Sequence, residues 1–156
     1  MTQTVVVDGR RIDVPPTVPL QHFVTRDESA APAPPPAAAR DFGPTELAPL
    51  GALFGARSGD KGGDANLGVW ATSGDDYAWL AQELTSDRLR ELLPETAPLE
   101  IDRYELPNIR AVNFVVRGLL GEGVAASTRP DPQAQSLGEL LRAQEVELPL
   151  ELLGQH

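Results

Sequence analysis

The sequence contains no cysteine and only two histidines, His22 and His156, in 156 residues. The absence of cysteine excludes disulfides, thiolate catalysis and Cys-ligated zinc or iron–sulfur sites. Acid–base catalysis by histidine is disfavoured, because only two histidines are present and one of them is the last residue. Any catalysis must therefore use carboxylates, lysine, arginine, serine or tyrosine, or groups on another chain. We expect no cofactor and no bound metal.

Long hydrophobic runs and an excess of positive charge are also missing. No apolar run approaches the roughly 20 residues of a membrane helix, and the N-terminus lacks the basic and apolar regions of a signal peptide. The 23 acidic residues outnumber the 13 basic ones, and the resulting net charge of -10 repels a phosphate backbone. We therefore expect a soluble cytoplasmic protein with neither a membrane nor a nucleic acid as partner.

Composition divides the chain into four segments. Residues 1–14 contain two short apolar runs around an Asp-Gly dipeptide, which predicts a hairpin with a tight turn. Residues 15–49 are rich in proline and alanine, which indicates an extended linker. We expect one folded domain over 50–145, in keeping with the length of the chain. Residues 146–156 form the expected C-terminal tail.

The folded segment alternates between strand and helix patterns. Short apolar runs predict strands over 50–56 and 67–72, joined by a polar loop. A further strand is predicted over 99–106, with a bulge because its apolar alternation changes phase. Leucine spacing predicts a helix over 75–93 that breaks near residue 85. A strand in GVAAST and a last helix, with Ser136 and Glu139 as a capping box, complete the pattern.

Residues 109–120, IRAVNFVVRGLL, fit two interpretations. The valines and leucines recur with helical spacing, while AVNFVV also has the β-branching of a strand. A strand would place Arg117 in phase with Val115, which the pattern treats as buried. We therefore predict a helix, with Arg110, Asn113 and Arg117 on one polar stripe.

The stretch ARSGDKGGDANLG, residues 56–68, concentrates polar side chains among four glycines. Glycine permits positive φ and lets successive backbone N–H groups face a ligand. With Arg57 and Lys61 behind them, such groups suit a carboxylate or a phosphate. A purely structural alternative stays open, in which Arg57 pairs with Asp60 or Asp64 and Asn66 folds the loop on itself.

Known motifs match this loop incompletely. Ser58 and Lys61 have the S-x-x-K spacing of a serine hydrolase, but the flanking glycines oppose a helix start and no K-T-G follows. Glycine follows Lys61, which departs from the phosphate-binding P-loop, and G-x-G-x-x-G is missing. Asp60, Asp64 and Asn66 offer oxygens to a metal ion, without the ligand order of an EF-hand. The anion site and the structural interpretation therefore remain the main alternatives.

Three ordered motifs, ARSGDKGGDANLGV, DRYELPNIRAVNFVVRGLLGEGV and SLGELL, resemble the small domain at the C-terminal end of acyclic terpene utilisation (AtuA-type) proteins. The resemblance covers residues 50–145. It implies a compact α+β domain of ferredoxin-like fold, with helices on one face of an antiparallel or mixed sheet. It also implies a place behind a much larger domain, which this chain does not hold, in the breakdown of acyclic terpenes and related branched acids or acyl-CoA thioesters.

The resemblance carries the family's motif positions onto two regions of this chain. Tyr104, Pro107 and Phe114 are assigned mainly to packing. The polar motif positions of the 57–66 loop and of the later segment form one site only if the strand over 50–56 lies beside the turn that follows residue 106. The predicted ligand-binding residues are Arg57, Ser58, Gly59, Asp60, Lys61, Asn66, Asn108 and Asn113.

The leading hypothesis is a small subunit or accessory domain of an AtuA-type catabolic enzyme. It partners a large AtuA-type chain or itself, and its 57–66 loop binds an anionic acyl or CoA group. Arg57 or Lys61 would neutralise the anion, and Asn108 or Asn113 would donate a hydrogen bond to an acyl oxygen. The alternative is a non-catalytic assembly module on a Pro/Ala tether. An independent enzyme is disfavoured by the scarcity of histidine and cysteine.

Overall fold

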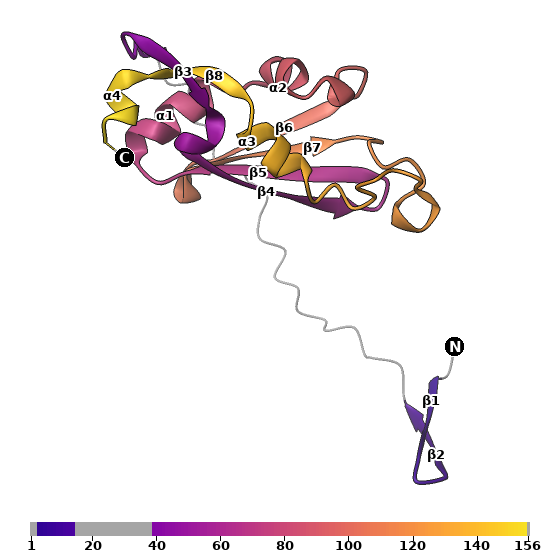
Figure 1. Ribbon diagram of the computed structural model, residues 1–156. Helices are drawn as coiled ribbons and strands as arrows, with labels where there is room; N and C mark the ends of the chain where they lie inside the picture. Colours follow the sequence, from indigo (N-terminus) through magenta and orange to yellow (C-terminus); the bar gives the residue numbers. More distant parts are fainter. Residues whose placement is uncertain (1–2, 15–38, 156) are drawn as a thin grey trace, which may run out of the picture. The chain divides into compact units, whose positions relative to one another are not determined.

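The computed structural model describes residues 3–14 and 39–155, which belong to two compact units, 1–37 and 38–156. In the first unit, β1 (Gln3–Val7) and β2 (Arg10–Val14) pair as an antiparallel hairpin (Figure 1). Asp8 and Gly9 have φ values of 49° and 74°, and a type I′ turn requires positive φ at both central residues. The hairpin predicted from the Asp-Gly dipeptide is therefore present.

The second unit is built on a four-stranded antiparallel sheet with the order β4-β5-β7-β6. Because β5 and β6 both run antiparallel to β7, they are parallel to each other, and the helices between them complete a split β-α-β unit. The element order β-β-α-β-β-α is a cyclic shift of the ferredoxin-like β-α-β-β-α-β. The strands are β4 (Phe54–Lys61), β5 (Asp64–Ala71), β6 (Ile101–Leu106) and β7 (Ala111–Val116).

Helices cover one side of this sheet (Figure 1). They are α1 (Gly74–Glu83), α2 (Ser86–Leu92) and α3 (Leu137–Arg142). The Ser73 hydroxyl accepts from the Asp76 N–H at 3.0 Å, and the Asp76 carboxylate accepts from the Ser73 N–H, so a capping box begins α1. The Thr85 hydroxyl caps α2 by accepting from the Arg88 N–H at 3.1 Å. The break predicted near residue 85 is confirmed.

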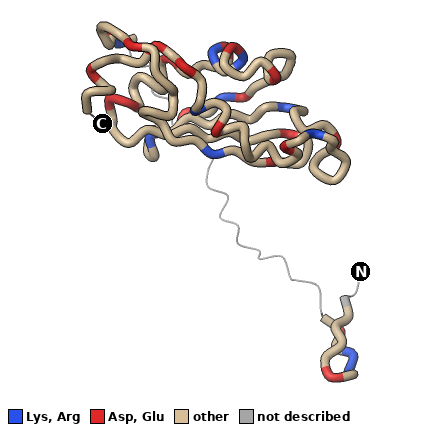
Figure 2. The backbone as a smooth tube through the Cα atoms, in the orientation of Figure 1, with Lys and Arg blue, Asp and Glu red and all other residues tan. Residues whose placement is uncertain are grey.

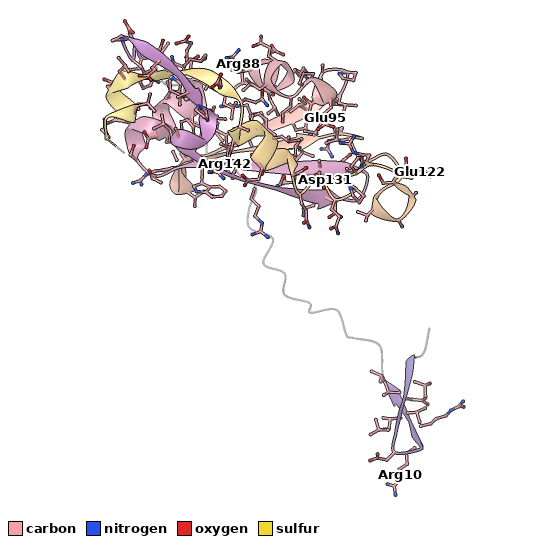
Figure 3. The ribbon with its side chains drawn as sticks, in the orientation of Figure 1. Arg10, Arg88, Glu95, Glu122, Asp131 and Arg142 are labelled. Atoms are coloured by element: carbon pink, nitrogen blue, oxygen red, sulfur yellow. The ribbon has the colours of Figure 1, made fainter. Side chains whose placement is uncertain are left out.

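The hydrophobic core lies between the sheet and these helices. Alternate residues of β5 and β7 point into it, and the pairs Leu67–Phe114 and Val69–Val112 lie opposite each other in the ladder. The Phe54 ring stacks on the Trp79 ring of α1 with centroids 5.4 Å apart. The Arg142 side chain at the end of α3 donates to the Phe54 carbonyl and ties α3 to β4 (Figure 3). The helices contribute Leu80, Leu89, Leu137 and Leu141.

The two ends of this unit's sequence pair with each other as a two-stranded ribbon. β3 (Thr45–Pro49) pairs antiparallel with β8 (Glu145–Pro149), and α4 (Leu150–Leu153) follows. Residues 45–49 therefore form a strand instead of the end of a linker, and residues 146–153 pack on the domain instead of forming a tail. The rest of the expected linker, 15–38, lies outside the described residues. The short 3₁₀ helices are η1 (Leu50–Ala52), η2 (Pro94–Thr96), η3 (Pro107–Ile109) and η4 (Val124–Ala126).

Four local expectations are corrected. Residues 111–116 form strand β7 instead of a helix, because Val112, Phe114 and Val116 alternate into the core. The register between β6 and β7 is continuous, so β6 has no bulge. GVAAST contains η4 in place of a strand. Ser136 precedes α3 without capping it, because its hydroxyl donates to Asp131 at 2.6 Å.

Candidate functional site

The glycine-rich stretch 56–68 is a β-hairpin with a two-residue turn. Lys61 ends β4 and pairs with Asp64 at the start of β5, which leaves Gly62 and Gly63 as the turn. Gly62 has a φ of 67° whereas Gly63 has no positive φ, and positive φ at the first central residue alone is the mark of a type II′ turn. All six polar residues expected in a loop are therefore strand residues, and their side chains alternate between two faces.

The face of the sheet opposite the helices, which we call the outer face, carries part of the predicted site. Within residues 39–155, no helix or strand covers it. Its side chains form rows across the four strands, because residues paired in a ladder point to the same side. In strand order β4, β5, β7 and β6, the rows are Gly55, Trp70, Ala111, Leu106; then Arg57, Gly68, Asn113, Tyr104; then Gly59, Asn66, Val115, Asp102.

A fourth row lies at the glycine turn. Lys61 pairs with Asp64 at the end of the β4–β5 ladder, and the Arg117 N–H donates to the Glu100 carbonyl at 2.9 Å, which continues the β6–β7 ladder by one residue. The Arg117 guanidinium contacts Asp64 at 2.8 Å and Asp102 at 2.5 Å. The Gly118 N–H and then Arg117 hold the pKa of the Asp64 carboxyl below its ordinary value, because both stabilise the ionised form. Asp64 and Asp102, in turn, raise the pKa of Arg117.

Arg57 and Lys61 are the exposed cations of β4 on the outer face. Among the described residues neither takes part in an ion pair, whereas seven other arginines of the second unit do. The Lys61 amino group donates to the Asp60 carbonyl at 3.3 Å. The structural alternative, in which Arg57 pairs with Asp60 or Asp64, is therefore wrong, since Asp64 binds Arg117 and Asp60 points to the other side of the strand.

Asn66 and Asn113 form an amide pair at the centre of the outer face. The Asn113 side-chain N–H donates to the Asn66 side-chain oxygen at 3.0 Å. Gly68 lies next to this pair, where a Cβ atom would lie 3.6 Å from the Asn113 oxygen. The two asparagines come from segments 47 positions apart, so the sheet brings together two members of the predicted set.

Three predicted residues do not join this group. The Ser58 hydroxyl faces the helix side, where it donates to the Gln135 carbonyl at 3.2 Å and accepts from the Gly138 N–H at 2.9 Å. Asp60 points to the same side as Ser58. Asn108 lies in η3 after β6, and two strands separate β6 from β4. The arrangement in which strand 50–56 lies beside the Asn108 turn is therefore wrong.

The alternation of side chains along β4 and β5 also argues against the serine-hydrolase site and the metal site considered above. Ser58 and Lys61 point to opposite faces of β4, so the lysine does not reach the serine hydroxyl. Asp60 points away from Asp64 and Asn66, which prevents the three from sharing a metal ion. Within residues 3–14 and 39–155, no group of three or more His, Cys, Asp or Glu side chains is arranged to hold a metal.

The glycines of the turn are explained by close packing. A Cβ atom on Gly63 would lie 2.3 Å from the Gly121 carbonyl oxygen, and the Gly63 carbonyl accepts from the Leu120 N–H at 2.9 Å. A Cβ atom on Gly123 would approach the Gly62 carbonyl to 3.3 Å. The stretch GDKGG therefore packs its backbone directly against GLLGEG, and the two motifs are spatial neighbours.

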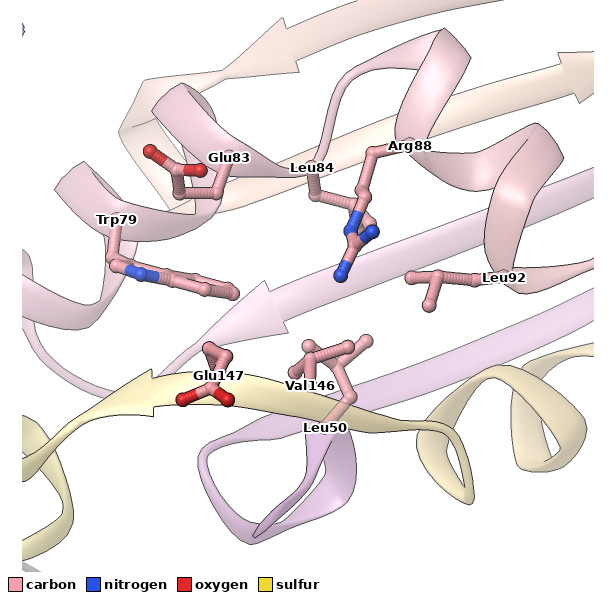
Figure 4. A pocket seen from close by; sticks show the side chains of 8 residues that line it. All are labelled: Leu50, Trp79, Glu83, Leu84, Arg88, Leu92, Val146 and Glu147. Atoms are coloured by element: carbon pink, nitrogen blue, oxygen red, sulfur yellow. The ribbon is translucent and has the colours of Figure 1, made fainter. Parts of the chain in front are cut away.

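A cavity of about 260 Å³ lies away from the outer face, between α1, α2 and β8 (Figure 4). Apolar side chains from Leu50, Leu84 and Val146 line it. The Arg88 guanidinium points into it, as Figure 4 shows, and also pairs with Glu91 at 2.6 Å. None of the predicted site residues lines this cavity.

Sequence reasoning missed the large side chains of the outer face. Trp70, Tyr104 and Leu106 are 41%, 49% and 40% exposed and lie in the first two rows. The Trp70 indole lies over Gly55, where a Cβ atom would come within 2.3 Å of the ring. The alternation of NLGVWA, in which Leu67 and Val69 point inward, is the signal that places Trp70 outward.

The model of one protein family, the AtuA ferredoxin-like domain, matches residues 48–147. The chain belongs to this family. The match spans all four strands of the sheet and helices α1 to α3, so it confirms the resemblance inferred from the three motifs and the ferredoxin-like α+β fold. No curated protein and no solved structure matches the chain. None of the described helices of this AtuA ferredoxin-like domain is long and apolar enough to span a membrane.

Proposed function

We propose that the chain is an accessory assembly domain of an AtuA-type catabolic enzyme and that it works through the outer face of its sheet. The observation that carries this proposal is the exposure of Trp70 and Tyr104 on the same face of the sheet as the unpaired Arg57. Protein interfaces concentrate tryptophan, tyrosine and arginine, and these residues supply most of their binding energy. A sheet face with these residues and no covering element in the described domain is typical of a docking surface.

The catalytic groups of the enzyme belong to its large chain in this proposal. The enzyme itself acts on acyclic terpenoid or branched acyl-CoA compounds, as the family relationship suggests. Residues 3–14 and 39–155 contain neither histidine nor cysteine, the side chains that most often act as acid–base groups and nucleophiles. In this proposal the domain positions or joins catalytic chains.

A matched pair of variants tests this proposal. Trp70→Thr removes the largest side chain of the outer face, and Leu140→Ala removes an apolar side chain of similar fractional exposure from α3 on the helix side. Each tagged chain is captured from native cell extract, and the AtuA-type large chain that accompanies it is quantified by mass spectrometry. We expect wild type and Leu140→Ala to retain the large chain and Trp70→Thr to lose at least tenfold. Equal recovery with all three chains, at equal thermal stability, would contradict the proposal.

A second candidate function is binding of an anionic acyl or CoA group, supported by the two unpaired cations of β4. Arg57 and Lys61 are four residues apart on one strand, or roughly 13 Å, so one carboxylate does not reach both. Coenzyme A carries separate phosphate groups, which suits two spaced cations better. Between these cations and β6, the Asn66–Asn113 pair offers amide groups to an acyl oxygen.

Calorimetric titration with CoA and with an acyl-CoA tests the second candidate. Lys61→Ala should weaken binding about tenfold, while Arg90→Ala, which removes an arginine of α2 paired with Asp87, should leave it unchanged. Absence of binding by wild type, or equal affinity of wild type and Lys61→Ala, removes this candidate and leaves the assembly role.

A further inference from the structure

The charge of the outer face differs from that of the chain as a whole. The chain has a formal net charge of -10, and Figure 2 shows acidic residues on most of its elements (Figure 2). On the outer face, three cations balance three carboxylates. The cations are Arg57, Lys61 and Arg117, and the carboxylates are Asp64, Glu100 and Asp102. A second copy of this acidic chain would be repelled by most of the surface and tolerated by this neutral face.

The balance is also polarised across the sheet. The unpaired cations Arg57 and Lys61 lie on β4, at one edge. At the opposite edge, β6 carries Tyr104, and Glu100 is the residue immediately before the first residue of β6. A face that is cationic at one edge, and aromatic and acidic at the other, is complementary to itself after a half-turn.

We propose that the outer face is a homodimer interface, formed by two copies related by a two-fold axis that runs parallel to the central strands. This inference rests on the proposed function and names a second copy as the occupant of the docking surface. This two-fold axis places β4 of one copy over β6 of the other. Each row of outer-face side chains in one copy then lies opposite the same row of the other copy. The two sheets then pack face to face at about 10 Å, as in an aligned β-sandwich.

The rows match under this operation. Arg57 of one copy faces Tyr104 of the other, which suits a cation–π contact. Lys61 of one copy faces Glu100 of the other in the row beside the glycine turn, and the two carry opposite charges. Both contacts occur twice in the dimer because the interface is isologous.

The sizes of the side chains match as well. In the first row, Leu106 of one copy faces Gly55 of the other, where the Trp70 indole already covers the glycine, so leucine packs on indole. In the second row, Asn113 of one copy faces Gly68 of the other. A larger side chain therefore meets a glycine in the second row, which is the condition for interdigitation, and leucine packs on the indole in the first row.

The area of the interface sets its expected strength. Four strands about 4.8 Å apart, two of eight residues and two of six, cover roughly 450 Å² on each copy. The total of about 900 Å² lies in the range of weak, transient interfaces, so we expect a dimer with a dissociation constant in the micromolar range. Its formation is therefore concentration-dependent.

Sedimentation equilibrium of the full chain over a concentration series tests the inference. We expect a monomer–dimer equilibrium for wild type and at least tenfold weaker association for Lys61→Glu and for Glu100→Lys, because each places like charges opposite one another. The double variant Lys61→Glu with Glu100→Lys restores opposite charges and should recover most of the affinity. Arg90→Glu reverses a charge on α2 and serves as the control, with association unchanged.

Each other outcome overturns the inference in an identifiable way. A chain that stays monomeric at millimolar concentration, or a dimer unaffected by Lys61→Glu, contradicts the two-fold interface. If that monomer still captures the AtuA-type large chain and Trp70→Thr loses it, the large chain occupies the outer face and the proposed function stands. If Trp70→Thr affects neither association nor capture, the inference and the proposed function fail together.

Discussion

The two glycines Gly59 and Gly63 lie in the same hairpin but should respond in opposite ways to alanine. A Cβ atom on Gly63 would lie 2.3 Å from the Gly121 carbonyl oxygen, and ordinary contacts begin near 3.4 Å. The backbone of one segment must then retreat by about 1 Å, and such overpacking costs about 1–3 kcal/mol. The hydrogen bond from the Leu120 N–H to the Gly63 carbonyl lies at the same contact, and weakening it adds about 1 kcal/mol.

At Gly59, by contrast, a Cβ atom would meet nothing within 4 Å, and φ is not in the left-handed region. Alanine there restricts the unfolded chain and should stabilise the fold by about 0.5 kcal/mol. We expect Gly63→Ala to lower the free energy of unfolding by about 2–4 kcal/mol, or roughly 8–16 °C in melting temperature. Urea titration and thermal unfolding by circular dichroism measure both variants. If Gly63→Ala is as stable as Gly59→Ala, the packing explanation of the glycine motif is wrong.

Three further variants test other contacts of the fold. Ser58→Ala leaves the Gly138 N–H without its acceptor and should destabilise the domain by about 1–2 kcal/mol in urea, whereas unchanged stability would mean that water replaces the hydroxyl. Ser73→Ala removes the N-cap of α1 at a cost of about 1 kcal/mol, and Ser73→Asp should retain most of the stability; equal loss in both would refute the capping role. The pKa of Asp64 is lowered in the folded state, so its stabilisation is complete above the ordinary value near 3.8 and disappears as pH falls through the lower folded pKa. Wild type should thus lose stability below pH 4 more steeply than Asp64→Asn in acid titration, and parallel curves would contradict this assignment.

Short sequence motifs are sufficient to predict the first hairpin and the boundary between α1 and α2, because both depend on residues close together in the chain. The Asp-Gly dipeptide determines the first hairpin because both residues tolerate positive φ. Thr85 separates α1 from α2 because its hydroxyl replaces a helix hydrogen bond at the start of the second helix. The three ordered motifs were enough for the family and therefore for the arrangement of helices on one face.

The helix prediction for the segment that forms β7 depends on the burial of Val115. If Val115 is buried, a strand places Arg117 in the same phase as a buried residue, and the pattern then favours a helix. In the structure Val115 is half-buried on the outer face, where Arg117 also lies and binds Asp64. An apolar residue on an open sheet face is compatible with a charged neighbour in phase, and only the sheet topology reveals which face is open.

The candidate site was predicted in part. Alternation along β4 and β5 was available in the sequence and separates Arg57, Lys61 and Asn66 from Ser58. Because its glycines and charges indicate an irregular backbone, the stretch is predicted as a loop, and a loop gives no information on which side chains share a face. The close approach between Gly63 and Gly121, which explains the glycines, joins segments 58 positions apart and leaves no local signal.

Lys61 allows the central claim to be measured directly, because it is the only lysine of the chain. Amine-selective labelling followed by mass spectrometry reports its accessibility, and the N-terminal amine of the same chain serves as the internal reference. If the outer face is an assembly surface, Lys61 should react freely in a dilute solution of the isolated chain and at least several-fold more slowly in the native assembly. Equal reactivity of Lys61 in both, relative to the reference amine, would contradict the account.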